Sequence, residues 1–160
     1  MDQLTQISGR NDFQAMVRAA LAEAASAGWR ELWLCDPDFA NWPLGERGVV
    51  ESLTQWVGAR RRLTVLATQY DDIVRLHPRW VQWRVQWAHV VSCRALPELQ
   101  ADDVPVLLHA PDGITLRLFD RLNYRGVVSR EMADGQQARE LLDAISQRSV
   151  EAFPATTLGV

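Results

Sequence analysis

Residues 27–68 read AGWRELWLCDPDFANWPLGERGVVESLTQWVGARRRLTVLAT, and this stretch decides the fold class. Glu31 to Cys35 is short and mostly apolar, which is typical of a strand that is buried on both faces. After a loop with two glycines, the apolar residues from Val49 to Val57 share one face of a helix, which Gly58 ends. Leu63 to Ala67 form a second buried strand. This order of strand, helix and strand with tight connections predicts parallel strands joined by a crossover helix.

A further helix precedes this stretch. Its apolar residues recur three and four positions apart, as on one helical face: Phe13, Met16, Val17, Ala20, Leu21 and Ala24. Asn11 or Asp12 can cap its start, and Gly28 can supply the left-handed residue at its end. The chain therefore begins with the order helix, strand, helix, strand.

The segment WVQWRVQW, residues 80–87, fits two kinds of element. It alternates apolar and polar residues as a strand does, but on a helix all three tryptophans fall on one side. We prefer the helix, because Pro78 suits a first helical turn. Asp71-Asp72 marks an earlier helix start, and His89 to Ala95 is the strand that follows.

The second half of the chain predicts antiparallel strands. Pro105 to Ala110 and Ile114 to Phe119 flank the turn signal PDG, and YRGVVS at 124–129 adds a third strand. Asp134 can cap a last helix. Its inner face would hold Ala138, Leu141, Leu142 and Ile145. Together these elements predict an α/β fold with a mixed, partly parallel sheet flanked by helices.

Length and composition limit what the chain can bind. At 160 residues and 18.1 kDa we expect one domain over residues 1–160, with 151–160 as a docked or loose tail. The net charge of −3 and the pI near 5.6 argue against nucleic acid as a partner. Without a long apolar run or a signal peptide, we expect no membrane span and a cytoplasmic location. Cys35 and Cys93 are expected to be buried thiols.

The basic residues show a second limit, because all 17 of them are arginine. The absence of lysine excludes a Walker A phosphate loop, a Schiff base and a Ser-Lys dyad supplied by this chain.

Three segments together resemble a phospholipase D-like domain: residues 27–68, HAPDGITLRLFDRLNYRGVVS at 109–129 and QARELLDAISQRSVEAFPA at 137–155. That family's catalytic signature is H-x-K followed by Asp, with His as the nucleophile, and a half-domain needs a partner to complete the active site. Here His109 is followed by Ala110 and Pro111. The resemblance therefore implies a degenerate half-domain of this fold that lacks the H-x-K signature.

Asp36 and Asp38 lie two positions apart just past a strand end, where open α/β sheets bind ligands. They resemble the D-x-D pair of haloacid-dehalogenase-type phosphatases, which attacks phosphorus and holds Mg²⁺. Three interpretations stay open: a turn that ends the strand, a Mg²⁺-dependent phosphohydrolase site, or a ligand-binding loop formed with Asn41 and Trp42. The scattered histidines suggest no metal site, and we expect no cofactor.

Two clusters are candidates for binding surfaces. Arg60, Arg61 and Arg62 form either a solvated turn or a phosphate-binding cluster. Seven tryptophans in 160 residues are unusual. Trp80, Trp83 and Trp87 with Arg84 form either core or the interface of a homodimer.

These observations predict a bacterial accessory or binding domain without catalytic activity. It would act through self-association as a homodimer, or by binding an unidentified protein partner. The rival function is a Mg²⁺-dependent phosphohydrolase that uses Asp36 and Asp38.

Overall fold

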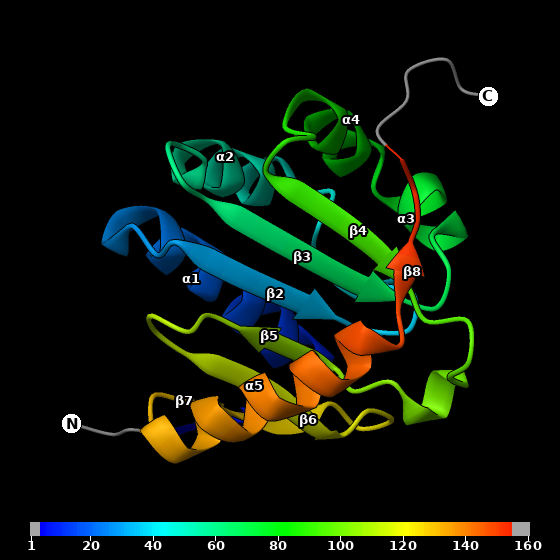
Figure 1. Ribbon diagram of the computed structural model, residues 1–160. Coiled ribbons are helices and arrows are strands. Elements are labelled where there is room, and N and C mark those ends of the chain that lie inside the picture. The colour runs from blue at the N-terminus through cyan, green and yellow to red at the C-terminus, as the bar shows by residue number, and fades with distance from the viewer. Residues whose placement is uncertain (1–3, 155–160) are drawn as a thin grey trace.

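The structure, a computed structural model, describes residues 4–154 of the chain (Figure 1). The strands are β1 (Leu4–Ser8), β2 (Glu31–Cys35), β3 (Arg62–Ala67), β4 (Val91–Ala95), β5 (Leu107–His109), β6 (Thr115–Asp120), β7 (Arg125–Ser129) and β8 (Val150–Glu151). The helices are α1 (Arg10–Ala27), α2 (Arg47–Trp56), α3 (Asp71–Leu76), α4 (Pro78–Gln86) and α5 (Met132–Gln147), with a 3₁₀ turn at Ala101–Asp103. None of the helices in this described range is long and apolar enough to cross a membrane.

All eight described strands form one sheet in the order β1-β7-β6-β5-β2-β3-β4-β8. β2, β3 and β4 are parallel to one another, and every other pairing is antiparallel. The crossover helix between the first two parallel strands is α2. The predicted fold class, a mixed and partly parallel sheet flanked by helices, is therefore confirmed.

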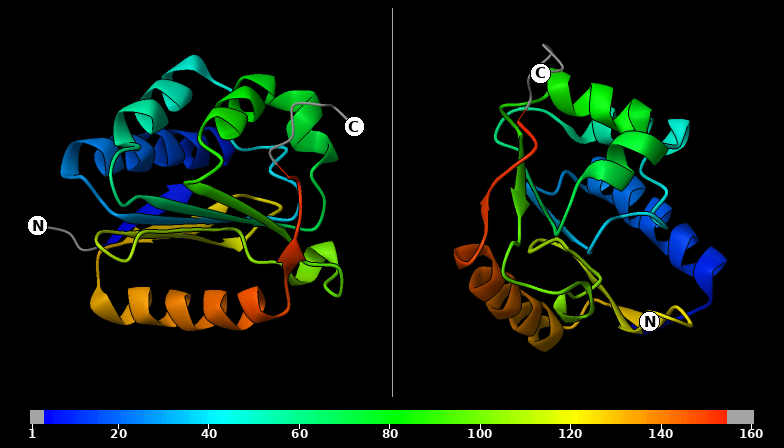
Figure 2. Two further views of the ribbon diagram at one scale, coloured as in Figure 1. Left: turned by 45° about the horizontal axis from the view of Figure 1, so that its top comes forward. Right: turned by 90° about the vertical axis from the view of Figure 1, so that its right-hand side faces the viewer.

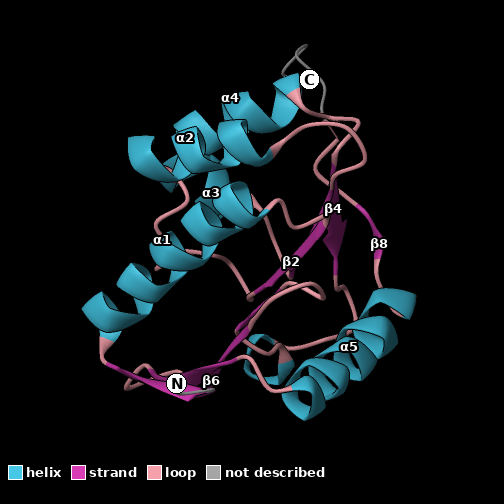
Figure 3. Cartoon of the chain, turned by 90° about the vertical axis from the view of Figure 1, so that its left-hand side faces the viewer, coloured by secondary structure: helices cyan, strands magenta, loops and turns pink. Residues whose placement is uncertain are grey.

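The sheet lies between two unequal helical layers. Helices α1 to α4 cover one face, and α5 alone crosses the other (Figures 2 and 3). The larger core lies between the sheet and α1 to α4, where side chains such as Phe13, Leu53 and Trp80 are fully buried. A smaller core under α5 contains Leu66 and Leu142. Burial of these two apolar layers is the main favourable term in folding.

The turn between β5 and β6 depends on one glycine. A Cβ at Gly113 would lie 2.1 Å from the indole ring of Trp29, closer than atoms can approach. The backbone N–H of Gly113 donates to the carbonyl of Ala110, as the predicted PDG turn requires. The turn therefore packs directly onto Trp29, two residues before β2 begins.

Two short strands, β1 and β8, were not predicted from the sequence. In β1 only Ile7 is buried, so the segment has no clear alternation, yet it pairs with β7 along its whole length. β8 has only two residues and pairs with β4. The backbone N–H of Ala152 then bonds Cys93 O at 3.0 Å, and the Phe153 ring stacks on Tyr70 at 5.1 Å. The tail is thus docked as far as Phe153, and the part of the predicted tail from 155 to 160 lies outside the described residues.

Candidate functional site

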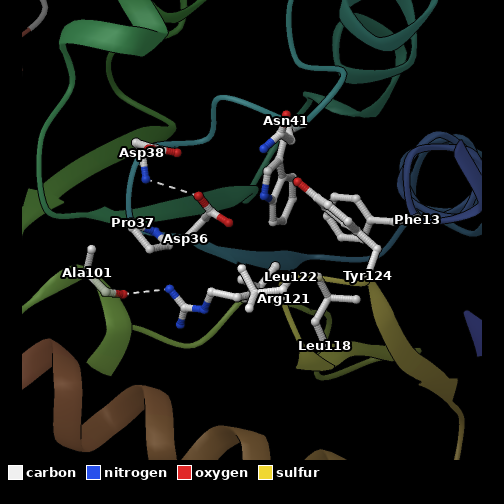
Figure 4. Close-up of a pocket in the computed structure, with 12 residues that line it drawn as sticks. Phe13, Asp36, Pro37, Asp38, Asn41, Ala101, Leu118, Arg121, Leu122 and Tyr124 are labelled. Atoms are coloured by element: carbon white, nitrogen blue, oxygen red, sulfur yellow. Dashed lines mark hydrogen bonds between the residues drawn. The ribbon is translucent and has the colours of Figure 1, made fainter. Parts of the chain in front are cut away.

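A pocket of about 320 Å³ lies at the carboxyl end of β2 (Figure 4). The four residues proposed from sequence as a ligand-binding loop, Asp36, Asp38, Asn41 and Trp42, all line it. They come from the loop between β2 and α2. The opposite wall comes from the β6–β7 hairpin, through residues that sequence reasoning did not select: Leu118, Arg121, Leu122 and Tyr124.

Both carboxylates of the loop bind backbone N–H groups. Asp36 Oδ2 accepts hydrogen bonds from the N–H groups of Asp38 (3.0 Å) and Phe39 (2.7 Å). Asp38 Oδ1 accepts one from the N–H of Ala40 at 3.0 Å. These bonds stabilise the turn that ends the strand, which is the first of the three interpretations of this loop. The described residues contain no group of three or more His, Cys, Asp or Glu side chains that could hold a metal ion.

The Asp36 carboxyl is only 8% exposed. Burial raises its pKa, because the ionised form loses its solvation. The N–H groups of Asp38 and Phe39 and the indole of Trp42 oppose this rise, and the negative charge of Asp38 adds to it. Asp36 is thus a carboxyl that lines the pocket with a pKa above its ordinary value.

Contacts from other elements hold the loop rigidly. His77 Nδ1 accepts a hydrogen bond from the N–H of Gly45 (3.1 Å), so its Nε2 carries the proton and donates to Phe39 O (2.8 Å). Both the N–H and the hydroxyl of Thr68 donate to Pro37 O, at 2.9 and 2.8 Å. Phe39 itself has a φ of 60°, in the left-handed region that non-glycine residues rarely adopt. The pocket is therefore preformed by a strained and well-supported turn.

The pocket has an aromatic wall and a fixed arginine. The Phe13 ring meets the Trp42 ring edge-to-face at 5.5 Å and the Tyr124 ring at 5.6 Å. The Arg121 guanidinium donates to three carbonyl groups at the 3₁₀ turn, those of Ala101, Asp102 and Val104. Arg121 therefore fixes this rim of the pocket.

A second cavity, of about 530 Å³, is lined by arginine side chains. Arg61, Arg62, Arg94 and His89 line it together with Trp33, and none of the lining residues is Asp or Glu. It lies over β3 and β4 on the side of the sheet that carries α5. Figure 1 shows α5 crossing from β7 toward β8, so that it covers the carboxyl end of β3, where Leu66 is buried, and leaves the beginnings of β3 and β4 open.

The arginines of this cavity differ in whether their guanidinium groups already have partners within the protein. Arg61 Nε donates to Trp56 O at 2.9 Å, and Arg94 donates to the hydroxyl and the carbonyl of Ser149. The Arg62 side chain is exposed and has neither an ion-pair nor a hydrogen-bond partner within residues 4–154. Arg60 is also exposed but does not line the cavity. Of the three arginines in the predicted phosphate-binding cluster, Arg61 and Arg62 thus line the cavity and Arg60 does not.

The predicted dimer face on α4 is wrong for three of its four residues. Trp80, Trp83 and Arg84 are 0%, 3% and 5% exposed, because α4 turns them toward the sheet and the docked tail. Arg84 Nη2 donates to Phe153 O at 3.0 Å. Only Trp87 is partly exposed. The helical pattern identified an apolar face correctly, but core and interface require the same pattern.

His109 ends β5 and is 3% exposed. Its Nδ1 is paired with the hydroxyl of Thr115 at 2.9 Å. Burial, with the positive charge of Arg139, lowers the pKa of this imidazole to about 4. At neutral pH His109 is therefore an uncharged side chain.

Comparison of the sequence with protein-family models and with curated proteins finds no match. Solved structures do match in fold. TrmBL2, described as an archaeal chromatin protein that shows a novel mode of DNA binding, is similar with a TM-score of 0.68 at 13% identity over 94% of this chain. The chain spans 54% of the TrmBL2 chain, about half its length. NucT from Helicobacter pylori is similar with a TM-score of 0.60 at 8% identity, over 93% of this chain and 98% of NucT.

These likenesses bear on two predictions. NucT is phospholipase D-like, so its similarity supports the phospholipase D-like fold. The prediction from net charge, which argued against nucleic acid as a partner, is contradicted by the likeness to TrmBL2, a DNA-binding chromatin protein. That prediction rested on net charge, which averages over the surface and misses a local cluster of arginines.

Proposed function

We propose that the chain is a non-catalytic nucleic-acid-binding domain of phospholipase D-like fold, which binds the phosphate backbone at the arginine-lined cavity. One observation carries the proposal. Three arginines and a histidine line this cavity without any carboxylate, in a chain whose net charge is −3. A concentration of guanidinium groups around one cavity of an acidic protein favours an anionic ligand there.

The cavity suits a phosphate backbone for two reasons. A guanidinium donates two parallel hydrogen bonds to phosphate oxygens, and Arg62 has no partner within the described chain that would have to be displaced. The hydroxyl-bearing Thr64 and Ser92 lie between Arg62 and Arg94 and can donate further hydrogen bonds. The fold shared with TrmBL2 supports a nucleic-acid ligand over other polyanions.

The non-catalytic part of the proposal rests on the sequence signature. The phospholipase D-like family needs a lysine two positions after its histidine, whereas Pro111 follows His109 at that distance and the chain has no lysine. Binding without cleavage is the expected result.

The experiment is fluorescence anisotropy with a labelled duplex and a labelled single strand, using wild-type protein, Arg62→Ala and the control Arg47→Ala. Arg47 is exposed at the start of α2, in the helical layer on the opposite face of the sheet, and forms no ion pair within residues 4–154. At ~0.1 M salt we expect Arg62→Ala to weaken binding about ten-fold, because one phosphate contact fewer releases about one counterion fewer. Arg47→Ala should bind like wild type.

The same samples, incubated with Mg²⁺ and analysed on a gel, report on cleavage. Intact strands are expected, and cleavage that persists after further purification would refute the non-catalytic assignment. Absence of binding by the wild-type protein, or equal losses in the two arginine variants, would refute the nucleic-acid assignment.

A further inference from the structure

The pocket at the carboxyl end of β2 is separate from the arginine-lined cavity and has the opposite charge. Asp36 and Asp38 contribute two carboxylates, and Arg121 contributes one guanidinium, which three backbone carbonyls already occupy. Asp36 Oδ1 and Asp38 Oδ2 accept no hydrogen bond from the residues that the structure describes. The pocket therefore presents free acceptors and a net negative charge.

The pocket's negative potential also acts on Tyr124. Burial raises the pKa of the Tyr124 phenol, and the charges of Asp36 and Asp38 add to this rise, while Arg10 opposes it. The carboxylates of Asp36 and Asp38 thus act across the pocket on the phenol of Tyr124. Both carboxylates would attract a positively charged group in this pocket.

The rest of the lining is apolar and aromatic. Val106, Leu118 and Leu122 lie on one side, and the rings of Phe13 and Trp42 on the other. Leu122 is 87% exposed, so its side chain can be covered by a ligand at a gain in free energy. A volume of about 320 Å³ is sufficient for a small molecule.

One buried donor in the pocket has no acceptor. Trp42 is 2% exposed, and its Nε1–H has no hydrogen-bond partner within the described chain, although it lies close enough to Asp36 to lower the pKa of that carboxyl. An unmet buried donor is costly. The indole N–H stabilises the ionised form of Asp36, and a ligand cation would act on that carboxylate in the same sense.

We propose that this pocket binds a small organic cation, whose protonated amine lies against the Asp36 carboxylate and whose apolar body lies against Leu118 and Leu122. The aromatic wall adds to the attraction, because aromatic faces carry partial negative charge. This site is additional to the proposed nucleic-acid contact and does not depend on it.

Binding of a ligand cation at low pH should release a proton from the Asp36 carboxyl. In the empty pocket burial raises the pKa of Asp36, so a fraction of the carboxyl is protonated at acid pH. The groups that face it are Asp38, Trp42, Tyr124 and Arg121, and the Arg121 guanidinium is held at the rim by three backbone carbonyls. Affinity is therefore expected to rise with pH as Asp36 ionises.

The test is isothermal titration calorimetry with three ligands of similar shape: phenethylamine, the uncharged 2-phenylethanol and the anionic phenylacetate. Phenethylamine should bind with a Kd on the order of 1 mM, as expected for so small a ligand. The other two should bind about ten-fold or more weakly, because they lack the charged hydrogen bond. Equal affinity for all three, tighter binding of phenylacetate, or no binding of phenethylamine would overturn the proposal.

Variants assign the binding to Asp36. Asp36→Asn keeps an oxygen for the N–H groups of Asp38 and Phe39 and removes the charge, so the turn should stay folded. It should lose the preference for phenethylamine, whereas Glu51→Gln, at an exposed position on α2, should keep it. A preference that survives in Asp36→Asn would overturn the assignment, and circular dichroism would establish that the variant is folded.

Discussion

At the scale of single residues, the buried groups Asp36 and His109 both contribute to the pH dependence of stability. Asp36 and His109 are each less than a tenth exposed, and burial shifts the pKa of each toward the uncharged form. The two shifts have opposite signs, so they act in different parts of the pH range.

We expect Asp36→Asn to become more stable relative to wild type as pH rises. The pKa of Asp36 is higher in the folded than in the unfolded state, so its stabilising contribution is complete below pH 3.8 and is lost as pH rises through the folded-state pKa. The amide that replaces the carboxyl in this variant does not ionise and avoids the loss. Urea unfolding at several pH values measures the difference, and a constant difference between pH 3.8 and 7 would contradict the shifted pKa.

His109 should destabilise the fold under acid conditions. The unfolded chain takes up this proton near pH 6.5, whereas the folded chain takes it up near 4. Stability is therefore lost as pH falls from 6.5 to 4, by on the order of 3 kcal/mol for this residue. His109→Asn should reduce the pH dependence of the free energy of unfolding between pH 4 and 6.5. This expectation holds whether the variant is more or less stable than wild type. An unchanged slope would show that the imidazole is not buried as described.

At the scale of elements, the parallel half of the sheet was easier to predict than its edges. The strands Glu31–Cys35 and Leu63–Ala67 have several apolar residues each, and the helix between them has a clear apolar face. β1 and β8 were missed, since one has a single buried residue and the other only two residues in all. β1 pairs with a strand that contains Ser129, and β8 pairs with a strand that contains Arg94. Because these partners are distant in the sequence, no local pattern predicts the pairing.

The turn at Gly113 gives a test of the element packing. Gly113→Ala should destabilise the fold by about 1 to 3 kcal/mol, because its methyl group would overlap the Trp29 ring. Gly48 in α2 has open space where a Cβ would lie, so Gly48→Ala should instead stabilise by about 0.5 kcal/mol. Thermal unfolding of the two variants compares them directly. A neutral Gly113→Ala would mean that the β5–β6 turn does not pack on Trp29.

At the scale of the whole molecule, the candidate sites combine residues that the sequence separates. The loop Asp36, Asp38, Asn41 and Trp42 was selected from its position after a strand, and it does line one pocket. Its opposite wall could not be predicted, because Arg121 and Tyr124 reach it only through the order of strands in the sheet. The arginine-lined cavity joins Arg61 and Arg62 to Arg94 from the next parallel strand for the same reason.

The arrangement separates two surfaces of opposite charge on one sheet. The arginine-lined cavity lies on the side of the sheet that carries α5, whose Ser146 contributes to its lining, and the acidic pocket lies at the carboxyl end of β2. A net charge of −3 therefore conceals a local surface that is suited to a polyanion.

The most direct test of the nucleic-acid assignment is the salt dependence of DNA binding. If Arg61, Arg62 and Arg94 each contact one phosphate, log K should fall with log salt with a slope of about −3. Arg62→Ala should reduce the magnitude of that slope by about one, and Arg47→Ala should leave it unchanged. A wild-type slope near zero, or the same slope in Arg62→Ala, would contradict the assignment of the arginine-lined cavity to the phosphate backbone.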